Sequence, residues 1–187
     1  MQSREAIAKA MFDLIGEGTL RPSAQRVADR AGVGIRTVFR HFDDMDRLYV
    51  EMDARVRDAV RPLLAKETPS GALAGRARKL VEVRCELYER IGPYKRSANL
   101  HRQKSDYLRR EHRDMVRDFR ADLQRWIPEL KDASSRSASA MEVAVSFETW
   151  DRLRSDQELS QKGAREVMLS LVEALLAQLP RKRDPLR

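Results

Sequence analysis

Residues 23–48 read SAQRVADRAGVGIRTVFRHFDDMDRL, and this stretch predicts two short helices joined by a tight turn. Ser23 is suited to begin the first helix, because its hydroxyl can accept a hydrogen bond from an otherwise unpaired backbone amide. Gly32 stands where that helix must stop, since glycine adopts the left-handed conformation at little cost. A second helix is expected over residues 35–41. Two short helices joined by a glycine turn predict a helix-turn-helix, whose second helix enters a DNA major groove.

The two expected helices each have an apolar side. In the first helix Val27, Ala28 and Ala31 fall at i, i+1 and i+4, so they share one buried face. In the second helix Val38 and Phe42 supply the apolar side, and the opposite side carries Arg36, Thr37, Arg40 and His41. Arginine can read guanine edges or hold phosphates, and a good bidentate base contact discriminates by about 1–3 kcal/mol. We expect Arg36 and Arg40 to contact DNA, although Arg40 equally suits a solvated surface.

The run VADRAGVGIRTVFRHFDDMDRL, residues 27–48, resembles the DNA-binding signature of the TetR (tetracycline repressor) family of transcriptional regulators. The resemblance implies an all-α fold. It implies an N-terminal three-helix helix-turn-helix DNA-binding domain over residues 1–50, followed by a helical effector-binding and dimerisation domain over residues 51–187. The residues to which we assign DNA binding on this basis are Ser23, Arg26, Gly34, Ile35, Arg36, Thr37, Phe39, Arg40, His41, Met45 and Asp46.

The sequence departs from the family pattern at three of these positions. Phe39 replaces the common tyrosine and lacks the hydroxyl that could donate to a phosphate, and Met45 stands where a lysine is usual. Gly34 stands where Ser or Thr often caps the helix, at a cost of only a few tenths of a kcal/mol. The backbone amides of Met45 and Asp46 remain available to a phosphate. We therefore expect a weaker nonspecific, salt-dependent contribution to DNA binding.

Composition favours a charged helical protein, with 42% apolar and 35% charged residues in 187. The net charge is +8, but residues 1–50 hold eight Lys/Arg and seven Asp/Glu, so the helix-turn-helix and not bulk basicity supports DNA binding. The single cysteine, Cys85, excludes an internal disulfide and suits a reducing compartment. Residues 1–15 are amphipathic rather than signal-like, and no apolar run approaches the roughly eighteen residues that span a bilayer. A cytoplasmic protein without membrane contact is expected.

No catalytic, metal-binding or cofactor-binding pattern stands out. The histidines, His41, His101 and His112, form no metal-ligand spacing with Cys85, and no glycine-rich phosphate loop is present. An enzyme is therefore disfavoured. A further helix is expected over residues 3–15, another from residue 46 toward Pro62, and a third that ends at Gly92-Pro93. Three more are expected over residues 103–126, 132–155 and 160–179.

The last two expected helices predict a dimer interface. Residues 132–155 are apolar on two sides and need two partners, and the last helix carries an apolar stripe too wide for one neighbour. The resembled family pairs these helices across a two-fold axis, which implies a homodimer and a palindromic operator. The residues assigned to the interface are Phe147, Trp150, Val167, Leu171 and Leu175; an internal core is the alternative.

Arg84, His112 and Glu148 fall on otherwise apolar helix faces. They are interpreted either as polar groups of an apolar effector pocket or as a structural Arg84–Glu148 ion pair beside a satisfied core histidine. Weaker pocket candidates are Tyr88, Met115, Phe119 and Trp126.

The function expected from these patterns is that of a homodimeric, ligand-responsive repressor, with double-stranded operator DNA, a second copy and an unknown small-molecule effector as partners. The alternative is a DNA-binding protein without small-molecule control, acting through a protein partner or as an architectural factor. Its best support is the arginine series Arg109, Arg113 and Arg117 on the helix over residues 103–126.

Overall fold

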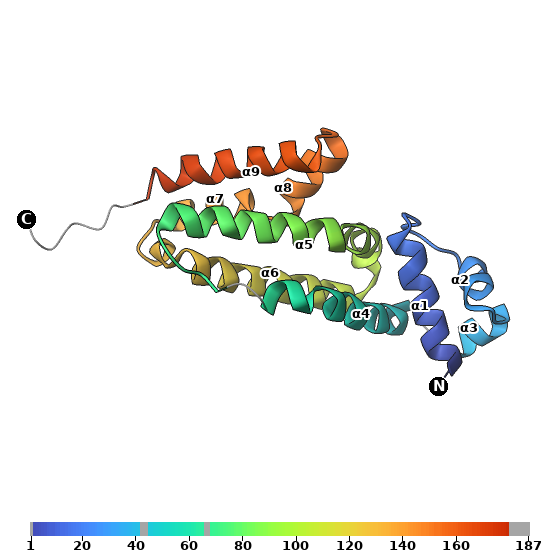
Figure 1. The fold of residues 1–187 in the computed structure, drawn as a ribbon. Coiled ribbons are helices and arrows are strands. Elements are labelled where there is room, and N and C mark those ends of the chain that lie inside the picture. Colours follow the sequence, from blue (N-terminus) through green and yellow to red (C-terminus); the bar gives the residue numbers. More distant parts are fainter. Residues whose placement is uncertain (1, 42–44, 66–67, 180–187) are drawn as a thin grey trace, which may run out of the picture. The chain divides into compact units, whose positions relative to one another are not determined.

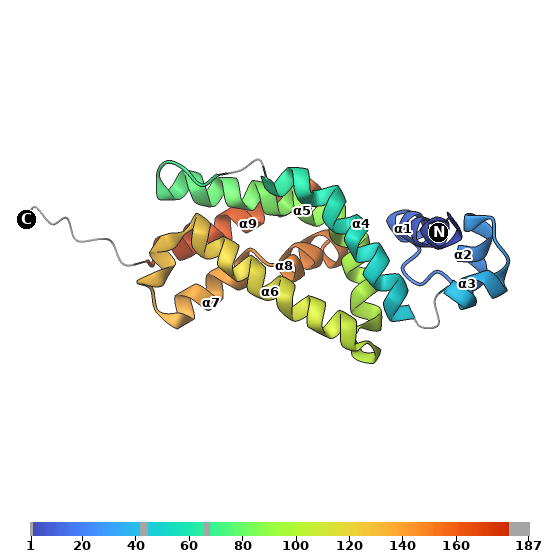
Figure 2. The same cartoon turned by 90° about the horizontal axis from the view of Figure 1, so that it is seen from below.

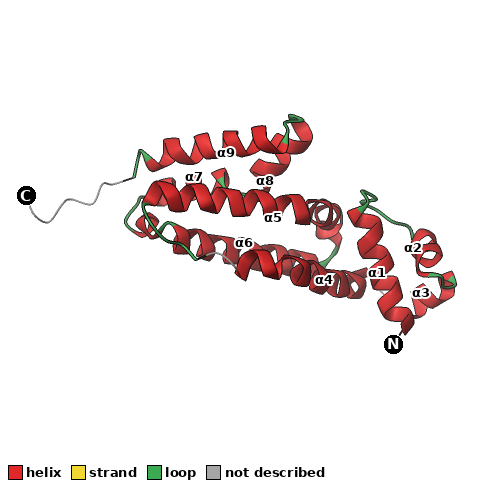
Figure 3. Cartoon of the chain, viewed as in Figure 1, coloured by secondary structure: helices red, strands yellow, loops and turns green. Residues whose placement is uncertain are grey.

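The computed structural model describes residues 2–41, 45–65 and 68–179, and within these ranges it contains helices and loops but no strand (Figures 1 and 3). The α-helices are α1 (Gln2–Gly16), α2 (Ala24–Ala31), α3 (Ile35–His41), α4 (Met45–Ala65), α5 (Leu73–His101), α6 (Asp106–Trp126), α7 (Ser135–Ala144), α8 (Phe147–Asp151) and α9 (Gln161–Leu176). Short 3₁₀ turns lie at Arg102–Lys104 and Pro128–Lys131, and a π turn at Arg152–Asp156. The expected all-α fold is confirmed for this part of the chain, and none of its helices is long and apolar enough to cross a membrane.

The described residues divide into two compact units. The first unit takes in the chain up to Ala65 together with Arg90–Met115, and the second takes in the remainder. The helices α5 and α6 each contribute residues to both units. The boundary at residue 50 between a DNA-binding and an effector-binding domain is a functional division and stays a prediction.

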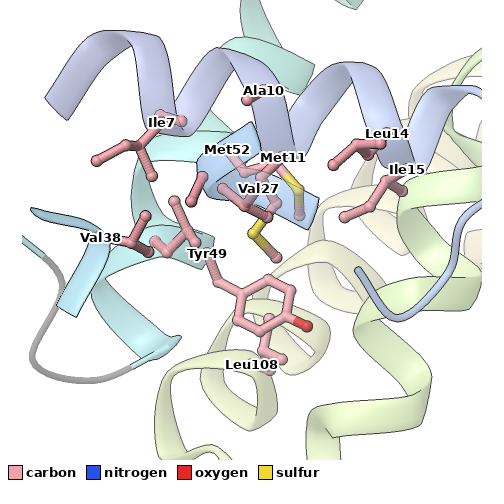
Figure 4. Close-up of a cluster of buried hydrophobic side chains, with 13 residues drawn as sticks. Ile7, Ala10, Met11, Leu14, Ile15, Val27, Val38, Tyr49, Met52 and Leu108 are labelled. Atoms are coloured by element: carbon pink, nitrogen blue, oxygen red, sulfur yellow. The ribbon is translucent and has the colours of Figure 1, made fainter. Parts of the chain in front are cut away.

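The core of the first unit forms around α1, which packs against α2, α3 and α4 (Figure 4). The apolar face expected of the amphipathic residues 1–15 is confirmed on α1, because Ile7, Met11 and Ile15 are fully buried. The other helices contribute to this core Val27 and Ala28 from α2, Val38 from α3, Leu48, Tyr49 and Met52 from α4, and Leu108 from α6. Each short helix of the helix-turn-helix is therefore anchored by an apolar side chain of its own.

The turn between α2 and α3 follows the expectation from sequence. Ser23 precedes α2 with extended backbone, and its hydroxyl accepts from the Arg26 amide at 3.2 Å. Gly32 ends α2 with φ of 67°, the left-handed conformation, and its amide donates to the Ala28 and Asp29 carbonyls. The helix expected over residues 35–41 is α3, which begins at Ile35 and ends at His41, so its expected bounds are confirmed.

The helix end expected at Gly92-Pro93 is wrong, and of the kink or end expected at Pro62 the structure excludes the end. Helix α4 continues through Pro62, and α5 continues through Gly92 and Pro93. A proline inside a helix removes one hydrogen bond, and tertiary packing can outweigh that loss. Beyond Pro93 the helix is held by such packing, because Tyr94 stacks on Phe12 with ring centroids 4.6 Å apart. The buried hydroxyl of Ser97 also donates to the Leu20 carbonyl at 2.8 Å.

The single helix expected over residues 132–155 is also wrong. The structure has α7 and α8 in its place as separate helices, followed by the π turn (Figure 2). Ser146 interrupts the helix with extended backbone at ψ of 161°, and its hydroxyl accepts from the Thr149 amide at 3.1 Å. Serine competes for backbone hydrogen bonds in this way, so it favours a helix start over a helix interior. Helix α9 begins in the same manner after Ser160.

We predict that Gly32→Ala lowers the free energy of unfolding by about 1 kcal/mol, because alanine resists the left-handed conformation. Gly75→Ala is the matched control. It adds the same methyl group within α5, where φ is not positive and no atom outside the helix's own backbone and the adjoining residues lies within 4 Å, and should raise the free energy of unfolding by about 0.5–1 kcal/mol. Urea denaturation followed by circular dichroism measures both. A Gly32→Ala protein as stable as the parent would contradict the role given to this turn.

Candidate nucleic-acid interface

Helix α3 turns one apolar residue inward and leaves a mixed surface outside. Val38 is 5% exposed and belongs to the core of the first unit. Arg36 and Arg40 are exposed, and among the described residues the structure gives neither of them an ion pair. Ile35 and Phe39 are exposed as well, at 37% and 59%. The outer side of α3 therefore presents two exposed guanidinium groups and two exposed apolar side chains.

The other residues assigned to DNA contact are placed as follows. Ser23, Arg26 and Gly34 are exposed, and Thr37 and His41 are half-buried. The Ser23 hydroxyl is already engaged as a helix cap, so its role is to position α2. Helix α4 begins at Met45, where the resemblance to the TetR family places a helix start that would face a phosphate. The side chains of Met45 and Asp46, like residues 42–44 with the expected apolar Phe42, lie outside what the structure describes.

An ion pair ties α2 to the end of α1. Arg30 donates to both Glu17 carboxylate oxygens at 2.8 and 2.7 Å. This hydrogen bonding holds the pKa of the exposed Glu17 carboxyl below its usual value. Arg30 is thus paired within the protein, unlike Arg36 and Arg40 on α3, for which the described residues give no ion pair.

Arg84, one of the residues assigned to an effector pocket, is buried in the second unit at 2% exposure. Its guanidinium donates to the Asp122 carboxylate and to the Phe119 carbonyl, each at 2.9 Å, and to the Tyr88 hydroxyl at 3.2 Å. It also lies 4.2 Å from the centre of the Phe119 ring. The expected pairing with Glu148 is wrong, because Glu148 is exposed while Asp122 holds the charge. The signal missed in the sequence is an acid within the apolar stripe of α6.

Tyr88 completes the cluster around Arg84. Its hydroxyl donates to the Val145 carbonyl at 2.8 Å, and its ring meets the edges of Phe119 and Phe147 at 5.9 and 5.6 Å. Complete burial raises the pKa of the Tyr88 hydroxyl, so it stays neutral. The structure thus brings Arg84, Tyr88 and Phe119 together as one hydrogen-bonded group.

The remaining pocket candidates do not join this group in the structure. Trp126 is buried in the second unit, where its carbonyl accepts from Arg76 Nε at 2.9 Å. His112 and Met115 belong to the first unit, and His112 Nδ1 lies 3.2 Å from Lys95 Nζ. Among the described residues no three His, Cys, Asp or Glu side chains gather as metal ligands.

The residues assigned to a dimer interface fall into two sets. Phe147 and Trp150 are 2% exposed within one protomer, and Trp150 Nε1 donates to Glu89 at 3.1 Å. They are therefore core residues of the second unit and offer no surface to a partner. Val167 and Leu171 are 38% and 43% exposed on α9, and Leu175 is half-buried.

We predict that Arg84→Ala lowers the free energy of unfolding by about 2–3 kcal/mol, because it leaves partly buried acceptors without their donor. Arg125→Ala is the matched control. Arg125 pairs with the same Asp122 carboxylate at 2.7 Å but is 53% exposed, so its loss should cost less than about 1 kcal/mol. Both tryptophans lie in the second unit, so their fluorescence in urea follows its unfolding. Equal effects of the two substitutions would contradict this assignment.

Comparisons with known proteins place the fold. No family model matches the sequence, and no curated protein matches it. Three solved structures do match over nearly the whole chain. A transcriptional regulator from Rhodococcus sp. Rha1 is 19% identical with a TM-score of 0.72, over 96% of this chain and 99% of that one. The multidrug binding protein EbrR, complexed with imidazole, is 18% identical with a TM-score of 0.65, over 97% and 98%. A protein described as a TetR-family transcriptional regulator, from Mesorhizobium loti MAFF303099, is 20% identical with a TM-score of 0.57, over 94% and 95%. The chain therefore has the fold of TetR-family transcriptional regulators.

Proposed function

We propose that this chain is a ligand-responsive repressor of transcription in the cytoplasm. It binds palindromic operator DNA as a homodimer and is released by a small-molecule effector. The observation that carries the proposal is the outer side of α3, where Arg36 and Arg40 are exposed without an ion pair among the described residues. Burial of Val38 on the other side fixes which face of the helix remains outside.

The DNA-binding part of the proposal rests on a match of shape and chemistry. A major groove about 12 Å wide admits one α-helix, and its floor offers guanine acceptors to arginine. A helix as short as α3 reaches few base pairs, so a second recognition helix is needed for specificity. Two-fold symmetry of the protein then requires a palindromic operator.

The dimer part rests on α9. Val167 and Leu171 lie one helical turn apart and are both exposed, while Ala164, Met168 and Val172 of the same helix are buried. A single exposed apolar residue is ordinary on a protein surface, but a row of them beside a buried stripe indicates a further partner. A second copy of α9 supplies such a partner.

The ligand-control part draws on the likeness to EbrR, whose solved structure holds imidazole, and imidazole is therefore the first compound to test. In the proposed mechanism the ligand favours an arrangement with altered tilt of α4, which follows α3 in the chain. A coupling of about 1–3 kcal/mol suffices for useful release. Operator affinity that stayed constant with every bound compound would remove ligand control and leave DNA binding intact.

The architectural alternative has less support from the arginines of α6. Within that series Arg109 is paired with Asp106 and Arg117 with Asp118 at 3.5 Å. Farther along α6, Arg120 donates to Glu142 at 2.8 Å and Arg125 pairs with Asp122. These four charges are neutralised within the protein, which favours a solvated helix face over a polyanion-binding surface.

We predict that Arg36→Ala lowers affinity for a palindrome selected from random duplexes by about 1–3 kcal/mol per half-site and relaxes the base preference there. Arg113→Ala is the control, because Arg113 is exposed on α6 and belongs to the arginine series of the architectural alternative rather than to the residues assigned to operator contact. Fluorescence anisotropy at one fixed salt concentration measures both. Equal losses for the two variants, or no selected palindrome, would contradict operator recognition by α3.

We predict that Leu171→Glu raises the dimer dissociation constant more than about tenfold, because a charge must then be buried in the interface. Lys162→Glu places the same side chain on the opposite side of α9, at a position 79% exposed, and should leave dimerisation unchanged. Sedimentation equilibrium distinguishes them. A parent protein that is monomeric at micromolar concentration would overturn the dimer.

A further inference from the structure

The outer side of α3 is organised in two parallel rows. Ile35 and Phe39 are four residues apart, as are Arg36 and Arg40, so each pair shares a face of the helix. At 100° per residue the two rows are neighbours; the arginine row lies opposite buried Val38, and the apolar row lies between the arginines and Val38. The DNA-binding face therefore has an apolar edge beside a basic edge.

The apolar row is only partly buried by the fold. Among the described residues of the first unit, Phe39 has the largest exposed fraction of the exposed large apolar side chains, 59%, and Ile35 is 37% exposed. A phenylalanine ring has no hydroxyl and donates nothing to a phosphate. The row thus offers a contact to an apolar group, and its position beside two arginines favours a polyanion over a second copy of the same basic surface.

We propose that Ile35 and Phe39 read thymine through its C5-methyl group, which makes them specificity-determining residues for the operator. The proposal rests on the proposed function and deepens it. The C5-methyl of thymine is the one apolar group that standard bases present in the major groove. The operator half-site then carries thymine beside the bases or phosphates contacted by Arg36 and Arg40.

The experiment removes this methyl group without changing any hydrogen bond. A palindrome is first selected from random duplex DNA with the full-length protein, and each thymine is then replaced in turn by deoxyuridine, symmetrically in both half-sites. A buried methyl group corresponds to about a fourfold change in affinity. For at least one position we expect about a 15-fold loss over the two half-sites, measured by fluorescence anisotropy.

The protein variants assign the methyl contact to the apolar row. The single variants Ile35→Ala and Phe39→Ala and the double variant are compared on the thymine and deoxyuridine duplexes. The double variant should bind the two duplexes with affinities within about twofold of each other. The single variant that loses the preference for the thymine duplex identifies the residue that contacts the methyl group. Leu100→Ala is the control, since Leu100 is 44% exposed on α5 and its loss should leave the full preference. Circular dichroism checks that these surface variants fold.

The outcomes separate this inference from the function on which it rests. A selected palindrome that tolerates deoxyuridine at every position, or that contains no thymine, overturns thymine reading while operator binding stands. Retention of the full preference in both single variants also overturns it. Failure to select any sequence removes both proposals.

Discussion

The burial of Val38 against the core around α1 is the contact on which the DNA-binding surface depends. Helix α3 has only seven residues, too few for stability as an isolated helix, so its orientation comes from packing. With Val38 inside, Arg36, Phe39 and Arg40 lie on the outer surface, and Ile35 lies at its edge at 37% exposure. The Gly32 turn makes this packing possible, since it redirects the chain within one residue of the end of α2.

The second unit, in contrast, holds a charged side chain inside its core. Arg84 is tolerated because a carboxylate, a carbonyl, a hydroxyl and an aromatic ring surround it. Desolvation offsets much of the attraction within such a cluster, so its net contribution to stability is small, although the loss of one partner is costly. It joins α5 to α6, and through Tyr88 to the end of α7. A ligand competing for Arg84 would therefore disturb three helices together.

Sequence reasoning succeeded where the signals are local. Ser23, Gly32 and the stripe of α1 are each specified by backbone or periodicity rules that act over one or two helical turns. It failed where tertiary contacts override local preference. The stack of Tyr94 on Phe12 carries α5 past Pro93, and the cap at Ser146 divides a helix that apolar periodicity alone joins. The partner of Arg84 was missed for a related reason, because several acids compete and only packing selects Asp122.

The most direct test of the central claim is methylation interference on a selected operator, since a methyl group at guanine N7 blocks the major groove. The account predicts two symmetric clusters of interference, spaced by about one helical turn or a multiple of it, with the pattern lost in Arg36→Ala. Binding that is indifferent to N7 methylation at every guanine, or a single cluster without a symmetric counterpart, would contradict the reading of DNA by paired α3 helices.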